Sequence, residues 1–225
     1  MISKLLDRLE ARFGRHKGIR NLMFIIVVGM AAVYLADYIL PAVANGRTLS
    51  SYLRFSKTGI MHGELWRLVT FVFVPMESYN ILLFAISLYF YWMMGSLLQN
   101  RWGTLRFTVF YITGMLGSVI SGCITGYATS YYLNMSLMLA VACIYPDMQL
   151  SLYGFLNLRL KWFALLSLLG MALPLINVRG WQQPVALAVA LMNVLLFFAD
   201  KLVKYVKQSW RHYQWKRNWR SGWRR

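Results

Sequence analysis

Acidic residues, histidines and cysteines are scarce in this chain, and each scarcity excludes a class of protein. Seven residues are Asp or Glu, against 24 Lys or Arg, and three are His. Charged residues make up 14% of the 225 residues, whereas a soluble domain carries about a quarter. The two cysteines, Cys123 and Cys143, both lie inside apolar runs, which predicts two buried small residues rather than a disulfide framework. The composition therefore excludes an ordinary soluble domain.

Ionisable residues are also missing from the middle of the apolar runs. The acidic residues stand at the ends of these runs, and no two histidines are close in sequence. A proton relay or a transporter needs ionisable groups near the middle of the membrane, and a metal site needs clustered ligands. We therefore expect no metal and no cofactor.

Long apolar runs are what the chain has in abundance, with 59% hydrophobic residues. The clearest begins at Tyr79 and continues for about twenty uncharged residues, enough at about 1.5 Å per residue to cross the ~30 Å hydrocarbon layer. The predicted fold class is all-α, a polytopic membrane protein with a bundle of six transmembrane helices. The expected spans are Leu22–Leu40, the run from Tyr79, Arg106–Ile124, Tyr131–Tyr145, Trp162–Ile176 and Pro184–Phe198.

The basic residues divide the chain into three regions and orient it. We expect an amphipathic basic segment at 1–20, a membrane domain at 21–205 and a basic Trp-rich tail at 206–225. Both ends suit anionic lipid headgroups, and the charge pattern does not favour nucleic acid. With both termini cytoplasmic, nineteen basic residues lie on that side and five on the other, as the positive-inside rule requires. We expect the plasma membrane of a bacterium.

The connections between the spans carry weaker signals. Residues 42–78 contain Glu64 and Arg67, which can pair if that piece is helical, and Trp66, which we place at the membrane interface. Residues 148–157 read as a short amphiphilic segment, and Pro174 is expected to kink or end the fifth span.

The third, fourth and sixth spans carry signs of close packing. Small residues recur every four positions, which lets helix backbones approach closely; they are Gly114, Ser118, Gly122, Ala186 and Ala190. The fourth span is only about 22 Å long, which fits the centre of the bundle better than a lipid-facing position. One end of it, with Asn134 and Ser136, is expected to open toward a water-filled depression.

The order of these features resembles the rhomboid superfamily, including derlins and other rhomboid-like pseudoproteases, over about residues 20–205. Leu65–Thr70 is similar to the family's Trp-Arg motif, with Trp66 and Arg67. Gly95, Gln99 and Gly103 resemble its Gly…Glu…Gly turn, with Gln in place of Glu. The run from Gln182 to Leu191 resembles its sixth helix, with alanines where glycines are usual.

The chain departs from the rhomboid pattern at the catalytic positions. The resemblance implies a Gly-x-Ser-Gly motif in the fourth span, where this chain has Asn134-Met135-Ser136 without a glycine. Gln183 stands where the catalytic His is expected, and Ser87 where an oxyanion Asn is expected. Ser136 is the only residual candidate nucleophile, and a serine needs a base within hydrogen-bond reach.

The histidines are His16, His62 and His212. Only His62 lies in the connection at residues 42–78, the outer loop, and it could approach Ser136 if that loop folded inward. We therefore expect a protein that is not an enzyme. The resemblance implies an inactive rhomboid-like protein that binds transmembrane segments of client proteins in membrane-protein quality control or trafficking. Two alternatives stay open, an active intramembrane serine protease that uses Ser136, and a lipid-binding or channel-like membrane protein.

Overall fold

Apolar helices make up most of the structure. It is a computed structural model that describes residues 7–8, 10–12, 14, 17–40, 48–75, 80–126, 128–152, 156–177 and 184–199. Its longer helices are α2 (Leu22–Ile39), α6 (Ile81–Trp102), α7 (Thr104–Thr125), α8 (Ser130–Ile144), α9 (Leu160–Asn177) and the helix Pro184–Ala199. Between α2 and α6 lie the short helices α3 (Leu49–Leu53), α4 (Lys57–Met61), α5 (Arg67–Thr70) and η1 (Phe71–Phe73).

Three of the described helices, α2, α6 and α7, are long and apolar enough to cross a membrane, judged by length and composition. The helices α8 and Pro184–Ala199 and the first part of α9 (Leu160–Leu169) are apolar but shorter. The prediction of a helical membrane protein is therefore confirmed, while the count of six spans stays a prediction.

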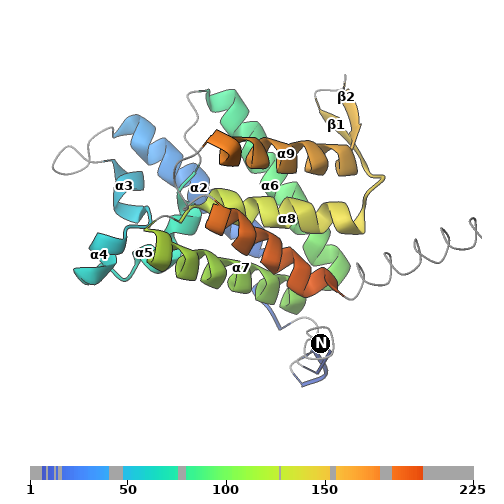
Figure 1. The fold of residues 1–225 in the computed structure, drawn as a ribbon, viewed down its shortest axis with the longest axis horizontal. Coiled ribbons are helices and arrows are strands. Elements are labelled where there is room, and N and C mark those ends of the chain that lie inside the picture. Colours follow the sequence, from blue (N-terminus) through green and yellow to red (C-terminus); the bar gives the residue numbers. More distant parts are fainter. Residues whose placement is uncertain are drawn as a thin grey trace, which may run out of the picture.

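Helix α8 lies in the middle of the bundle, as its shortness predicts. Figure 1 shows α9 along one side of α8, with α7 and the helix Pro184–Ala199 (red) on the other side. Helix α6 crosses α8 and packs against both α7 and α8, and α2 packs on α6. Most residues of α8 are buried.

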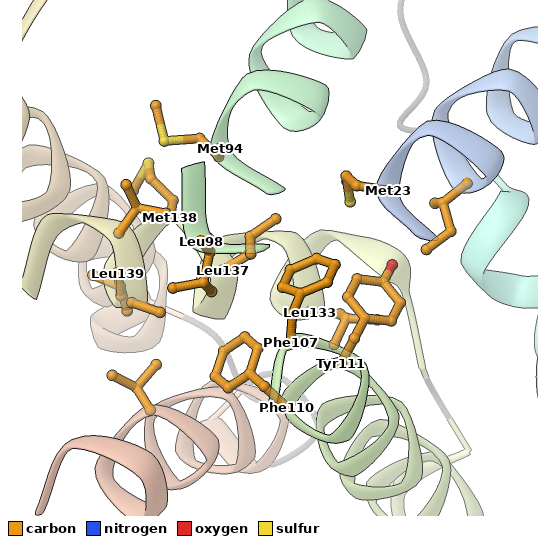
Figure 2. Close-up of a cluster of buried hydrophobic side chains, with 14 of the residues drawn as sticks. Met23, Met94, Leu98, Phe107, Phe110, Tyr111, Leu133, Leu137, Met138 and Leu139 are labelled. Atoms are coloured by element: carbon orange, nitrogen blue, oxygen red, sulfur yellow. The ribbon is translucent and has the colours of Figure 1, made fainter. Parts of the chain in front are cut away.

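Large apolar side chains from four helices fill the centre. Figure 2 shows Phe107 and Phe110 of α7 beside Leu133 of α8, with Met23 of α2 and Met94 of α6 around them. All five are almost fully buried. The aromatic rings of α7 therefore join the central helix α8 to the longer helices around it.

Small residues let the helices approach as closely as this core requires. A Cβ atom at Gly114 would lie 2.6 Å from Leu133 Cδ1 of α8 and 2.7 Å from Asn193 Nδ2 of the last helix. One at Gly122 would lie 2.7 Å from Phe55, in the outer loop. Ser118 is buried between them, and Ala186 and Ala190 are buried on the last helix. The stripe on α7 therefore makes close contacts with α8 and the last helix at Gly114 and with the loop at Gly122.

The short amphiphilic segment expected at 148–157 forms most of a two-stranded hairpin. Strand β1 (Gln149–Leu152) pairs antiparallel with β2 (Leu156–Arg159), and Gln149 faces Arg159 in the register. Leucines alternate with polar residues in both strands, a period-two signal that favours strands and that the sequence prediction missed.

Helix α9 continues through Pro174 to Asn177, so Pro174 does not end the fifth helix, and a kink there stays a prediction; membrane helices tolerate an internal proline when neighbouring groups satisfy the freed carbonyl. The expectation of two buried cysteines is wrong. Cys123 and Cys143 are exposed rather than buried. Membrane helices present apolar residues to lipid as well as to the core, so an apolar run does not indicate burial.

Ion pairs fix the described parts outside the core. The Arg106 guanidinium bonds Glu10 at 2.7 Å and Asp7 at 2.6 Å, which holds the start of the chain against α7. After α8, Lys161 donates to Asp147 at 2.7 Å, and this hydrogen bond lowers the pKa of the Asp147 carboxyl below its usual value. Asp147 is thus a loop residue paired with the first turn of α9.

We predict that Gly114→Val destabilises the bundle by about 1–3 kcal/mol or more, because the added side chain overlaps Leu133 and the Asn193 amide. Cys123→Val, on the exposed face of α7, is the control and should change stability by less than about 0.5 kcal/mol. Unfolding of the purified protein in mixed micelles measures both. Equal stability of the two variants would contradict the close approach of α7 to α8.

Candidate functional site

A cavity of about 270 Å³ lies between α6, α8 and α9. Ser87 and Phe90 of α6, Asn134 and Met138 of α8, and Ser167 of α9 are among the residues that line it. The structure thus brings together Ser87 and Asn134, two of the positions expected to correspond to lost catalytic groups. A cavity therefore lies at this end of α8, but apolar side chains make up most of its wall and Ser136 does not line it, so the water-filled character of the depression stays a prediction.

Ser136 lies on a different side of α8 from this cavity. Two residues along a helix turn the side chain by about 200°, so Ser136 and Asn134 point in nearly opposite directions. Ser136 is 1% exposed, and its hydroxyl donates to the Leu133 carbonyl, 2.7 Å away, in the same helix. This bond uses the hydroxyl proton, as is usual for a serine that packs inside a helix bundle.

The side-chain partner of Ser136 is an amide from the last helix. Asn193 Nδ2 lies 3.5 Å from Ser136 Oγ and 3.4 Å from the Phe110 carbonyl, and the Thr113 hydroxyl lies 3.1 Å from Asn193 Oδ1. Asn193 therefore links α7, α8 and the helix Pro184–Ala199. A neutral carboxamide offers an N–H and a weak acceptor, not a base that takes a proton from serine.

The sequence prediction missed Asn193 and named Gln183, which lies outside the described residues. The signal in the sequence that could have identified Asn193 was its position on the helix. Ala186, Ala190 and Asn193 are spaced by four and three residues, so they share one helix face. A polar residue on the face that small residues mark as packed is expected to bond across the interface.

His62 does not reach toward Ser136. Its ring follows α4 in the outer loop, is exposed, and places Nδ1 2.7 Å from the Thr58 carbonyl oxygen. His16 and His212 lie outside the described residues. Among the described residues, the hydrogen-bonding partners of Ser136 are therefore Leu133 and Asn193 alone.

Asn134 is the polar group of the cavity that remains unsatisfied. It is 3% exposed, and its Oδ1 accepts no hydrogen bond from any described residue. The Ser87 hydroxyl, across the cavity, donates to the Phe84 carbonyl of its own helix at 2.7 Å. A buried acceptor without a donor costs about 1–3 kcal/mol, which a bound donor would recover.

The Trp-Arg motif organises the outer loop. Arg67 is 5% exposed; it donates through Nε to Glu64 at 2.5 Å and through Nη1 to the carbonyls of Ser51 and Arg54. The predicted Glu64–Arg67 ion pair is therefore present. Arg67 also joins two segments of the loop, since Glu64 lies just before it and Ser51 and Arg54 lie in α3 and directly after it. Trp66 is exposed, as an interfacial residue requires.

Two glycines have different roles in α6 and in the turn that follows it. Gly103 has φ of 89°, a left-handed conformation that ends α6 and begins α7, and its N–H bonds the Gln99 carbonyl at 2.8 Å. Gly95 is buried against Met23, where any Cβ would overlap the methionine side chain. The Gln99 side chain is half-buried near this turn. These three residues thus set the turn and the contact of α6 with α2.

A second cavity, of about 380 Å³, lies where the outer loop meets the start of α8. Its wall includes Arg54, Phe71, Val74, Thr129 and Tyr132. In its wall, the Ser130 hydroxyl donates to the Val74 carbonyl at 2.8 Å, which ties the loop to α8. This cavity contains no described residue whose buried polar atoms lack a partner.

Comparison with known families matches residues 21–198 to a family described as eukaryotic integral membrane protein (DUF1751). The chain belongs to this family. The match includes the longer helices from α2 to Pro184–Ala199, with only Ala199 beyond it. No curated protein and no solved structure matches the chain.

Membership of this eukaryotic integral membrane protein family corrects one expectation. The bacterial plasma membrane predicted from sequence is wrong, because the family is eukaryotic. The charge bias that suggested the orientation is a property of helical membrane proteins in general and does not identify the organism. An integral membrane protein with several helices agrees with the family description.

We predict that Arg67→Ala loosens the outer loop, because the carbonyls of Ser51 and Arg54 each lose a charged donor, worth about 1.5–3 kcal/mol apiece. Arg67→Lys should restore little of the loop's order, since an ammonium group cannot reproduce the planar set of N–H donors of a guanidinium. Limited proteolysis between residues 48 and 66 in proteoliposomes measures the effect. Cleavage rates equal to wild type for Arg67→Ala would contradict this role.

We also predict an order of stability at the Ser136 contact. Ser136→Ala should cost less than about 1 kcal/mol, since the hydroxyl bonds mainly to its own helix. Asn193→Leu should cost more, at about 1–2 kcal/mol, because it removes bonds between helices. Unfolding in mixed micelles measures both, and the reverse order would contradict the assignment.

Proposed function

We propose that this protein is a catalytically inactive, rhomboid-like membrane protein of six spans that binds transmembrane segments of client proteins. The observation that carries the proposal is the bonding of Ser136. Its hydroxyl donates to the Leu133 carbonyl, and the nearby side chain from the last helix is the Asn193 amide. The chain keeps the order of motifs that resembles rhomboids while the serine faces no described base.

Inactivity follows from the acid–base chemistry of that contact. A serine attacks a peptide carbonyl only if a neighbouring base accepts its proton. The Asn193 amide cannot accept it, and the described histidine, His62, is held at the Thr58 carbonyl in the outer loop. This chemistry favours a role in binding over a role in cleavage.

Client binding is supported by the position of the cavity between α6, α8 and α9. Both α6 and α9 pack on α8, and the cavity lies between them. Large apolar side chains of α6 and α9 are exposed there, among them Leu83, which lines the cavity, and Leu166, next to Ser167 of its wall. A transmembrane helix can lie against such a surface, and the short α8 favours a locally thinned bilayer that admits polar client helices.

The two alternatives receive less support. A serine protease requires a base at Ser136, and the described partners provide none. A lipid-binding role rests on the basic tail 206–225, which lies outside the described residues. Anionic lipid at the two basic ends stays a prediction that is compatible with client binding.

The test uses the full chain in proteoliposomes with a photo-crosslinking residue at position 167, in the cavity wall, or at position 120, on the exposed face of α7. We expect single-span proteins to crosslink at position 167 and much less at position 120, without any cleavage product. Ser136→Ala should leave the crosslinks unchanged. Cleavage that disappears in Ser136→Ala would overturn inactivity, and equal crosslinking at both positions would overturn the binding site.

A further inference from the structure

Asn134 combines three properties that point to a ligand. Its side chain lines the cavity between α6, α8 and α9, it is almost fully buried, and its Oδ1 accepts no hydrogen bond from any described residue. Buried polar atoms are bonded in the great majority of cases, so an exception needs an explanation. In hydrocarbon the cost of an unpaired acceptor is larger than in a solvated cleft, because lipid chains supply no donor.

Ser87, Ser167, Tyr91 and Tyr131 also line the cavity, and the remaining wall is apolar and adaptable. Phe90 and Leu83 come from α6, and Met135 and Met138 flank Asn134 on α8. Methionine side chains are flexible and polarizable, and they suit surfaces that bind several different partners. The wall therefore favours a varied apolar ligand that carries one hydrogen-bond donor.

The cavity size decides what part of a ligand enters. At about 270 Å³ it falls just below the range of about 300–1,000 Å³ typical of pockets for drug-sized molecules. A helix about 10 Å wide cannot enter it, but a single long side chain can. Leu83, at the cavity wall on α6, and Leu166, beside Ser167 on α9, are exposed apolar side chains against which the body of that helix can lie.

We propose that this cavity is a subsite for one donor-bearing side chain of a client transmembrane helix, with the Asn134 carbonyl oxygen as its acceptor. The inference rests on the proposed client-binding function and specifies which clients are preferred. Asn134 lies four residues after the first residue of α8, or about 6 Å along the axis, so the donor enters near one end of α8. A polar side chain at that depth of a client lacks partners in lipid and gains one here.

The experiment uses two synthetic single-span helices that differ at one position placed at the depth of Asn134, Gln in one and Met, of similar shape, in the other. Binding to the full chain is measured by energy transfer in phosphatidylcholine vesicles, with helix self-association measured in vesicles without protein. We expect the wild-type chain to bind the Gln helix about three- to twentyfold more tightly than the Met helix.

Asn134→Leu should abolish this preference, so that the Gln and Met helices bind about equally, while the Met helix binds as before. Its unfolding temperature should equal or exceed that of wild type, because leucine removes an unpaired acceptor. Asn134→Ala is a second variant and should lose the preference as well. Asn100→Leu, the same change at an exposed position near the other end of α6, should retain it.

The outcomes separate the two proposals. Equal binding of both helices by wild type would overturn the subsite and leave client binding intact, whereas no binding of either would overturn both. A preference that survives in Asn134→Leu would place donor recognition elsewhere and overturn the role of Asn134. A lipid retained by wild type and lost from Asn134→Leu in native mass spectrometry would show that a lipid occupies the cavity, which also overturns the inference.

Discussion

Helix α8 lies in the middle of the bundle, and its polar side chains must find partners inside the protein because hydrocarbon offers none. Ser130 bonds the Val74 carbonyl of the outer loop, and Ser136 bonds Leu133 and contacts Asn193. Asn134, on another face, has no donor among the described residues. On the side of α8 toward α7 and the last helix, the polar side chains therefore have hydrogen-bond partners. On the side toward the cavity, the Asn134 acceptor has none among the described residues. This division separates a structural serine from a candidate binding site only two residues away.

The hydrogen-bonded side of α8 depends on small residues. Gly114 lets Leu133 and Asn193 approach α7 closely, and Gly95 does the same for Met23 of α2. With larger residues the amide of Asn193 could not lie near Ser136, since the helices would be pushed apart. The stripe of glycines thus determines which polar groups meet in the core, and the contact of Ser136 with the Asn193 amide is a consequence of packing.

Much of this arrangement could be predicted from the sequence, because the length of an apolar run and the spacing of small residues are local properties. The bounds of α2 and the start of the last helix at Pro184 agree with the predicted spans, and the shortness of α8 correctly indicated its central position. Asn193 was missed, because the choice of partner across a helix interface depends on rotations that periodicity does not fix. The exposed cysteines were misjudged for a related reason, since apolar residues in a membrane face lipid and core alike.

The central claim is that the Ser136 hydroxyl is a packing group and not a nucleophile. Treatment of the full chain in proteoliposomes with a fluorophosphonate, followed by peptide mass spectrometry, tests it most directly, because the reagent forms an adduct only with an activated serine. The account predicts an unmodified Ser136 at reagent concentrations that fully label an active serine hydrolase in the same vesicles. A stoichiometric adduct on Ser136 would contradict it.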